Sequence, residues 1–182
     1  MEAEIAETFA FCPKCGEPTP AGQSGGNRFK CGDCDYVLYF NQGSAVAAIL
    51  YDPDGRVLFL RRQRDPGRGK LGLPGGFIDS GESAEEALVR EVFEETALEI
   101  QEWRYLASFP NRYIYRNITY LVTDLFYVCP VDDFSGITPD ASEVAAWVSA
   151  FPHDVLERGE AFAFASNQRA VEKFASRAAS KS

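Results

Sequence analysis

The feature that most constrains this chain is a run of acidic residues directly behind a glycine-rich loop. The loop ends in Gly75 and Gly76, and the acidic side chains between Asp79 and Glu95 are interrupted by a single basic residue, Arg90. Carboxylates at this density repel one another, and a helix built only for stability would place more Lys or Arg four residues away. A hard divalent cation such as Mg²⁺, which prefers oxygen ligands and phosphates, would supply the missing positive charge.

The acidic run is predicted to form a helix over residues 84–96. Ser83 followed three residues later by Glu86 is a capping box, in which each side chain accepts a hydrogen bond from the other residue's backbone. At about 100° per residue, one arc of this helix is apolar, and we expect its members to be buried. They are Leu88, Val89, Val92, Phe93 and Thr96.

The glutamates occupy a second arc of the same helix. Glu91, Glu94 and Glu95 lie beside the apolar arc, and we expect them to face a cleft. Ala84 and Ala87 continue this arc toward the start of the helix, where their small side chains would leave room for a ligand. The alternative is a solvated acidic helix face, and the order of the surrounding residues argues against it.

That order resembles the signature of the Nudix hydrolases. The matching residues are Gly76-x(5)-Glu82-x(7)-Arg90-Glu91-Val92-x-Glu94-Glu95-x-Ala97-Leu98. The family has glycine where this chain has Ala97, and because alanine is strained at positive φ, the helix is expected to end differently here. The resemblance implies an α/β fold, an α/β/α sandwich with a mixed sheet.

The resemblance also implies roles for individual residues. Glu91, Glu94 and Glu95, with the carbonyl of Gly76, would bind Mg²⁺ or Mn²⁺, while Glu82 would pair with Arg90 to support the helix. The implied reaction is hydrolysis of a diphosphate linkage by a metal-activated water. The general base is left open between a glutamate of the helix and Glu143, which could equally be a solvated loop acid.

The second constellation consists of two Cys-x-x-Cys knuckles. Cys12 and Cys15 precede Cys31 and Cys34 by a spacing that predicts one tetrahedral zinc site, favoured over a disulfide or a redox pair. No hydrophobic secretory segment precedes the knuckles, so we expect a reducing, cytoplasmic compartment. A segment of about forty residues cannot fold by apolar burial alone, so the zinc would be structural.

Charge limits the partners of the chain. With 182 residues and a formal net charge of −9, it is predicted not to bind anionic membranes, and nucleic-acid binding by the zinc ribbon is disfavoured. The remaining roles for the ribbon are structural or dimer-forming, so a homodimer is left open. We predict a zinc ribbon over residues 1–40 and a hydrolase domain over residues 41–182.

The rest of the chain reads as strands and a final helix. Strands are predicted over 45–51, 57–62, 120–129 and 145–148, a helix near Asp154, and a closing helix over 168–177. A hairpin turn is expected at Asp52–Gly55. Between the second strand and the glycine-rich loop, residues 61–70 form a basic loop suited to phosphate groups, with Arg62 as a candidate contact.

The substrate is the least constrained part of the prediction. A zinc ribbon with this signature resembles the NADH pyrophosphatase group, but the aromatic and proline element of that group is only partly matched after Ser108. Phe109, Arg112, Tyr113 and Tyr115 could stack a nucleobase and hold a phosphate, or form a dimer interface. We therefore expect a nucleotide-derived substrate such as ADP-ribose, FAD or NAD(H). The alternative is a nucleotide-sensing regulator with little turnover.

Overall fold

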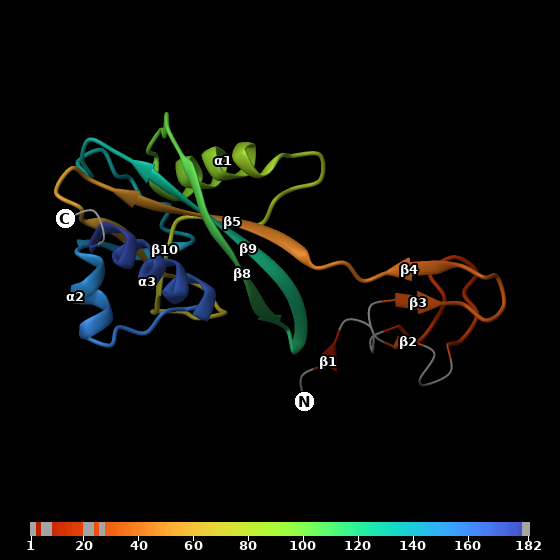
Figure 1. Ribbon diagram of the computed structural model, residues 1–182. Coiled ribbons are helices and arrows are strands. Elements are labelled where there is room, and N and C mark those ends of the chain that lie inside the picture. The colour runs from red at the N-terminus through yellow and green to blue at the C-terminus, as the bar shows by residue number, and fades with distance from the viewer. Residues whose placement is uncertain (1–2, 5–8, 20–23, 26–27, 180–182) are drawn as a thin grey trace. The chain divides into compact units, whose positions relative to one another are not determined.

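The computed structural model describes residues 3–4, 9–19, 24–25 and 28–179. They divide into two compact units, the first containing residues 1–43 and 112–121 and the second containing residues 44–111 and 122–182. The elements follow in chain order (Figure 1): β1 Ala3–Glu4, β2 Ser24–Gly25, β3 Arg28–Lys30, β4 Val37–Tyr39, β5 Gly43–Tyr51, β6 Val57–Arg62, β7 Leu71–Gly72, α1 Ala84–Thr96, β8 Arg104–Tyr115, β9 Ile118–Pro130, β10 Val144–Ala150, α2 Pro152–Glu157 and α3 Ala165–Ala179.

The first unit is built on a small antiparallel sheet in the order β2-β3-β4. Phe29, from the middle of β3, is fully buried with Cys12 and Cys31, and Phe9, Leu38 and Phe40 pack against them. So few apolar side chains give little burial, as expected for a module that depends on a metal. In the same unit, β1 pairs in parallel with the start of β9.

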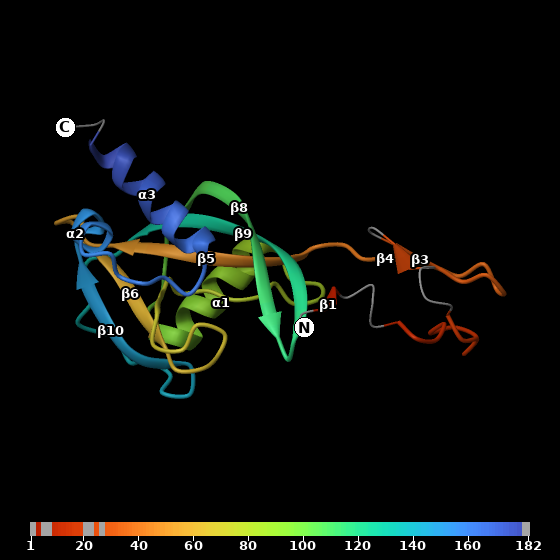
Figure 2. The same cartoon turned by 90° about the horizontal axis from the view of Figure 1, so that it is seen from below.

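The second unit places one sheet between helices. Its strands follow the order β9-β5-β6-β10, with β8 paired to β9 and β7 to β6. Successive residues of β5 point to opposite faces, so Ala48 joins a core with Leu88 of α1, while Ile49 joins a core with Val171 of α3. Figure 2 shows α1 and α3 on opposite sides of β5. The expected α/β/α sandwich with a mixed sheet is confirmed.

Most predicted elements are confirmed, because their local signals are strong. Helix α1 spans the predicted residues, and both hydrogen bonds of the capping box between Ser83 and Glu86 are present. The strand over 57–62 is matched by β6, and the other predicted strands and the closing helix are each a few residues longer in the structure. Gly55 turns the predicted hairpin at φ +85. None of the described helices is long and apolar enough to span a membrane.

Two expectations for α1 are wrong. Phe93 was expected in the core but is 52% exposed, whereas Ala87, expected to border a ligand, is fully buried. The buried face is rotated away from Phe93 because the sheet contacts Ala87, Leu88 and Val92, and Glu95 shares that face. Ala84 packs at the edge of the same core.

The end of α1 also differs from the expectation. Ala97 adopts the left-handed conformation, with φ 60, and its N–H donates to the carbonyl of Phe93. The family's usual helix end is therefore retained with alanine in place of glycine. Leu98 N–H donates to Thr96 Oγ1 at 3.1 Å, and this bond helps to hold the turn.

We predict that Ala97→Gly stabilises the protein. Left-handed backbone costs an L residue with a Cβ roughly 1–2 kcal/mol, partly offset by the greater chain entropy of glycine when unfolded. The free energy of unfolding should rise by about 0.5–1 kcal/mol, measured by urea denaturation. The control, Ala175→Gly inside α3, should lower it by about 1 kcal/mol. Equal destabilisation by both changes would contradict the strain at Ala97.

Candidate active site and metal centre

Four cysteine side chains meet in the first unit. The sulfur atoms of Cys12, Cys15, Cys31 and Cys34 all lie within 4.8 Å of one another. The Sγ atoms of Cys12 and Cys34 are 3.8 Å apart, and those of Cys15 and Cys31 are 3.7 Å apart. A tetrahedral zinc with Zn–S bonds of about 2.3 Å separates its sulfur ligands by about 3.8 Å. The four cysteines therefore have the geometry to bind zinc.

The hydrogen bonds within this cluster favour the thiolate of Cys12. Burial raises the pKa of the Cys12 thiol, but hydrogen bonds from the backbone of Cys15 and Lys14 and from the side chains of Cys15 and Cys31 together lower it to about 6, whereas the pKa of Cys15 is raised to about 12 by burial and the neighbouring thiols. The thiolate is the form that binds metal. Cys129 differs, since burial in the second unit raises the pKa of its thiol to about 12. It is a core thiol, as predicted.

In the second unit, the helix α1 presents its three glutamates at different depths. Glu94 is exposed, Glu91 is half-buried and Glu95 is 8% exposed. The carboxylate of Glu95 accepts a hydrogen bond of 2.9 Å from the N–H of Gly75, which ties the end of α1 to the glycine-rich loop. This places Glu95 deeper than the cleft position expected from the sequence.

Gly76 lies directly against Glu91. A Cβ built on Gly76 would stand 2.5 Å from the carboxyl atoms of Glu91, so no larger residue fits without displacing that side chain. The carbonyl of Gly76 accepts a hydrogen bond of 2.9 Å from Val46 N–H and retains a second lone pair. Glycine here allows the Glu91 carboxylate to lie against the loop backbone.

Arg90 organises the carboxylates along α1. Its guanidinium contacts Glu82 at 2.8 Å, Glu91 at 2.7 Å and Glu94 at 3.2 Å. The hydrogen bonds from Arg90 lower the pKa of Glu82 to about 2, so this carboxylate stays ionised. The predicted pairing of Glu82 with Arg90 is present, and the same arginine also holds two of the three predicted metal ligands.

Burial disfavours the charged forms of two of these carboxylates. Burial raises the pKa of Glu95 to about 8, with Glu91 and Glu143 adding to the rise, while Gly75 N–H and Arg62 oppose it. Burial also raises the pKa of Glu91. A divalent cation placed here would reverse both shifts by favouring the charged carboxylates. The donor set of carboxylates and one free carbonyl lone pair is the kind that Mg²⁺ takes.

The carboxylate oxygens of the α1 glutamates do not converge on one metal position in this structure. Within the described part of the chain, only the cysteines bring three or more candidate ligand atoms within 4.8 Å of one another. Glu91 and Glu94 contact Arg90, and Glu95 contacts Gly75, so binding a cation would require these side chains to exchange partners.

Glu143 and Arg62 lie near this group. Glu143 precedes β10, forms an ion pair of 3.3 Å with Arg64 and influences the pKa of both Glu91 and Glu95. Arg62, at the end of β6, donates to the carbonyl of Pro66 at 2.8 Å and stacks over the ring of Phe164. The structure thus brings both predicted residues into the electrostatic environment of the α1 glutamates.

The other predicted substrate contacts are divided between the units. Phe109 belongs to the second unit, where it packs against Phe126 and lies 4.2 Å beneath the guanidinium of Arg169. Arg112, Tyr113 and Tyr115 belong to the first unit. Tyr115 is 46% exposed and carries Arg116 over its ring.

A buried polar group at the start of α3 could not be predicted from the sequence. Asn167 Oδ1 accepts a hydrogen bond of 3.1 Å from Leu73 N–H, and Ser166 Oγ donates to Asp124 at 2.5 Å. Burial raises the pKa of Asp124. Each contact joins residues more than forty positions apart, and no periodicity or motif links them in the chain.

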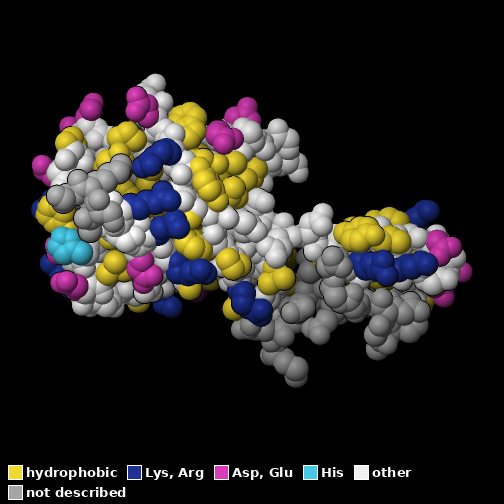
Figure 3. Space-filling model, viewed as in Figure 1, with side chains coloured by type: hydrophobic (Ala, Val, Ile, Leu, Met, Phe, Trp, Pro, Cys, Tyr) yellow, Lys and Arg dark blue, Asp and Glu magenta, His cyan; other side chains and the backbone are white. Residues whose placement is uncertain are grey.

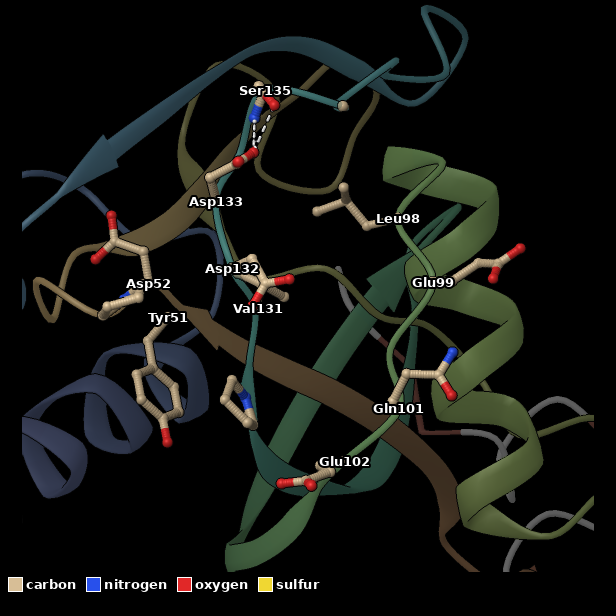
Figure 4. A pocket seen from close by; sticks show the side chains of 13 residues that line it. Tyr51, Asp52, Leu98, Glu99, Gln101, Glu102, Val131, Asp132, Asp133 and Ser135 are labelled. Atoms are coloured by element: carbon tan, nitrogen blue, oxygen red, sulfur yellow. Dashed lines mark hydrogen bonds between the residues drawn. The ribbon is translucent and has the colours of Figure 1, made fainter.

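A pocket of about 680 Å³ lies elsewhere in the second unit (Figure 4). It is formed by the β5–β6 turn, the segment after α1 and the end of β9, and none of the predicted site residues lines it. Its acidic side chains disfavour an anionic diphosphate. They are Asp52, Glu99, Glu102, Asp132 and Asp133.

Basic side chains gather on another face of this unit. Figure 3 shows Lys and Arg side chains over α3. This helix carries Arg169, Lys173 and Arg177 at intervals of four residues, so they follow one side of the helix. In a chain with a net charge of −9, such a face attracts anions.

Comparison with known protein families identifies a matching domain family for most of this chain. Residues 41–171 match the family described as NUDIX domain. An ADP-ribose pyrophosphatase of Methanocaldococcus jannaschii is 44% identical over 63 residues, 35% of this chain and 37% of that protein. The NAD-capped RNA hydrolase NudC of Edwardsiella ictaluri is 33% identical over 108 residues, 59% of this chain and 41% of that protein. Human mitochondrial NAD(P)H pyrophosphatase NUDT13 is 38% identical over 102 residues, 56% and 28% of the respective chains.

The solved structures show the same fold. The NUDIX domain of Shewanella oneidensis NrtR, crystallised with ADP ribose, has a TM-score of 0.63 at 24% identity, covering 76% of this chain and 89% of that one. A MutT NUDIX hydrolase of Burkholderia pseudomallei has a TM-score of 0.62 at 22% identity, covering 73% and 98%. The alignments span less than half the length of the three curated relatives. Because the family match covers well over half of this chain, the protein belongs to the Nudix family.

Proposed function

We propose that this protein is a Mg²⁺-dependent pyrophosphohydrolase that cleaves the diphosphate linkage of a nucleoside diphosphate derivative. The observation that carries the proposal is the contact of Gly76 with Glu91, beside Glu95 and within the ion-pair network of Arg90. The relatives named for ADP-ribose and NAD(P)H favour that class of substrate, to which FAD also belongs. The products would be a nucleoside monophosphate and a second phosphomonoester.

In this proposal Glu91, Glu94, Glu95 and the Gly76 carbonyl hold the catalytic cation. When bound, Mg²⁺ or Mn²⁺ neutralises diphosphate oxygens and lowers the pKa of a bound water. Arg90 and Glu82 fix the orientation of α1. Glu143, with a side chain 48% exposed, is the proposed proton acceptor, since it lies near the α1 glutamates and remains open to solvent.

The substrate would be held outside the metal-binding group. In the second unit we assign a phosphate contact to Arg62 and base stacking to Phe109; for the first unit, taken by itself, we propose Arg112 as a phosphate contact and Tyr113 and Tyr115 as stacking residues. The positive face of α3 supports the approach of an anion to the second unit. The exposed Ile114 and Tyr115 also leave room for a homodimer, which light scattering would measure.

For the first unit we propose a structural zinc bound by Cys12, Cys15, Cys31 and Cys34. The four thiols would occupy every tetrahedral position and leave none for a substrate. We also propose a reducing, cytoplasmic location, in which the thiols stay available for the metal.

We predict that Glu94→Gln leaves the fold intact and lowers turnover with Mg²⁺ by at least about 10²-fold. Glu94 is exposed, so the change costs little stability, while loss of a metal ligand removes stabilisation of the transferred phosphoryl group. Release of phosphomonoesters from ADP-ribose, NADH and FAD would be measured. Glu102→Gln, an exposed acid outside the site, is the matched control. Unchanged turnover by the Glu94 variant would refute the assignment.

The same substrate panel separates hydrolysis from nucleotide sensing. A hydrolase releases both phosphomonoesters with Mg²⁺ over many turnovers. A sensing domain would bind ADP-ribose or NADH in calorimetry without releasing product, and that result would overturn the proposed activity.

We predict one zinc per chain by elemental analysis of the purified protein. Cys31→Ser should abolish zinc retention and unfold the first unit, because metal binding supplies about 10–16 kcal/mol in comparable small modules. Cys129→Ala is the control, since this buried thiol lies outside the cluster and its loss should leave the zinc content unchanged. Intact ribbon structure with neither zinc nor sensitivity to chelators would rule out the proposed site.

A further inference from the structure

The metal loop, Leu73–Gly76, is held along one edge by β5. Ala48 N–H donates to the carbonyl of Pro74 at 2.8 Å, and Val46 N–H donates to the carbonyl of Gly76 at 2.9 Å. A side chain at Gly75 would collide with the backbone of Val46, so β5 and the loop are in direct backbone contact. This edge therefore fixes the loop by regular backbone hydrogen bonds.

The opposite edge of this segment also begins with backbone hydrogen bonds, but they stop before Leu73. Leu71 N–H donates to the carbonyl of Ala161 at 2.9 Å, and its carbonyl accepts from Ala163 N–H at 2.7 Å. This short parallel pairing cannot continue, because the chain turns into α3 at Ala165. The next inward-facing donor, Leu73 N–H, would be left without a backbone partner from this segment.

The side chain of Asn167 fills that position. Its Oδ1 accepts from Leu73 N–H at 3.1 Å, and both residues are 6% exposed. Asn167 thus acts as the carbonyl of the missing strand residue and extends the pairing by one step. A buried amide donor cannot use bulk water instead, so loss of this acceptor must be met by movement of the loop.

Movement of Leu73 would also displace Gly75 and Gly76, which contact the proposed metal ligands. Gly75 N–H, two positions further on, donates to Glu95, and Gly76 packs against Glu91. Partners outside the ligand set often orient metal ligands, and removing them typically lowers metal affinity about 10–100-fold.

We propose that Asn167 is a positioning residue that sets the metal loop through Leu73 and so couples the docking of α3 to cation binding. The proposal rests on the proposed function for the identity of the bound cation. It assigns no contact between Asn167 and the substrate.

The test compares substitutions at two adjacent buried positions in the full-length protein. Asn167→Leu removes the acceptor at similar volume, and Asn167→Ser shortens the side chain so that it no longer reaches Leu73 N–H. Asn167→Asp retains a carboxylate oxygen as the acceptor. Ser166→Ala is the matched control, because it removes the hydrogen bond to Asp124 at the same helix end and does not touch Leu73. Mn²⁺ affinity without substrate would be measured by electron paramagnetic resonance, together with thermal stability, kcat and KM.

We expect Asn167→Leu and Asn167→Ser to weaken Mn²⁺ binding about tenfold or more. Asn167→Asp should stay within about twofold of wild type, and Ser166→Ala should lower the melting temperature with Mn²⁺ affinity unchanged. Turnover should fall through kcat, with KM for the substrate unchanged at saturating metal. Equal Mn²⁺ affinity in wild type and both acceptor-deleting variants, or equal losses in Ser166→Ala, would overturn the proposal. If wild type bound Mn²⁺ without hydrolysing any substrate, the proposed function would be refuted. The role of Asn167 would still be tested by the Mn²⁺ affinities of the variants.

Discussion

The arrangement of the second unit depends on the ion pairs of Arg90. One guanidinium contacts Glu82 on the preceding loop and Glu91 and Glu94 on its own helix. Without it, α1 would concentrate like charges against a buried face, and each carboxylate would favour protonation or exposure. With it, Glu82, Glu91 and Glu94 share one cation, while Glu95, held by Gly75 N–H, is buried and has a raised pKa. Arg90 therefore favours the ionised forms of Glu82 and Glu91, whereas Glu95 would be ionised by a bound cation.

Local signals determined what could be predicted from the sequence. The capping box at Ser83 and Glu86 defined the start of α1, and the Cys-x-x-Cys spacing identified the cysteine cluster, because both depend on neighbours in the chain. The rotation of α1 was predicted less well. Periodicity placed Phe93 in the apolar arc, but the sheet selects Ala87 and Leu88. Small residues can pack closely against a strand, and a pattern of hydrophobicity alone does not contain that information.

Long-range contacts account for most of what sequence reasoning missed. Asn167 meets Leu73 across 94 positions, and Glu143 influences the pKa of Glu95 from the turn before β10. Neither residue belongs to a periodic segment or a spaced motif of its own. Glu143 could still be proposed from its place before a Trp-containing strand. Asn167 could not, because its function as a substitute strand partner exists only once α3 has folded beside β7.

The elements around the metal loop carry opposite charges. α1 contributes carboxylates that attract a cation, whereas residues 61–70 and α3, on the other side of the sheet, contribute basic side chains that attract an anion. In the proposed function, a diphosphate would meet the α1 carboxylates through its divalent cation and the basic side chains of residues 61–70 through its oxygens. The metal loop lies between these elements and is bonded to each, through Glu95 on one side and Asn167 on the other. Under the proposal for Asn167, this loop is the route by which a change in α3 would alter cation binding without touching a metal ligand.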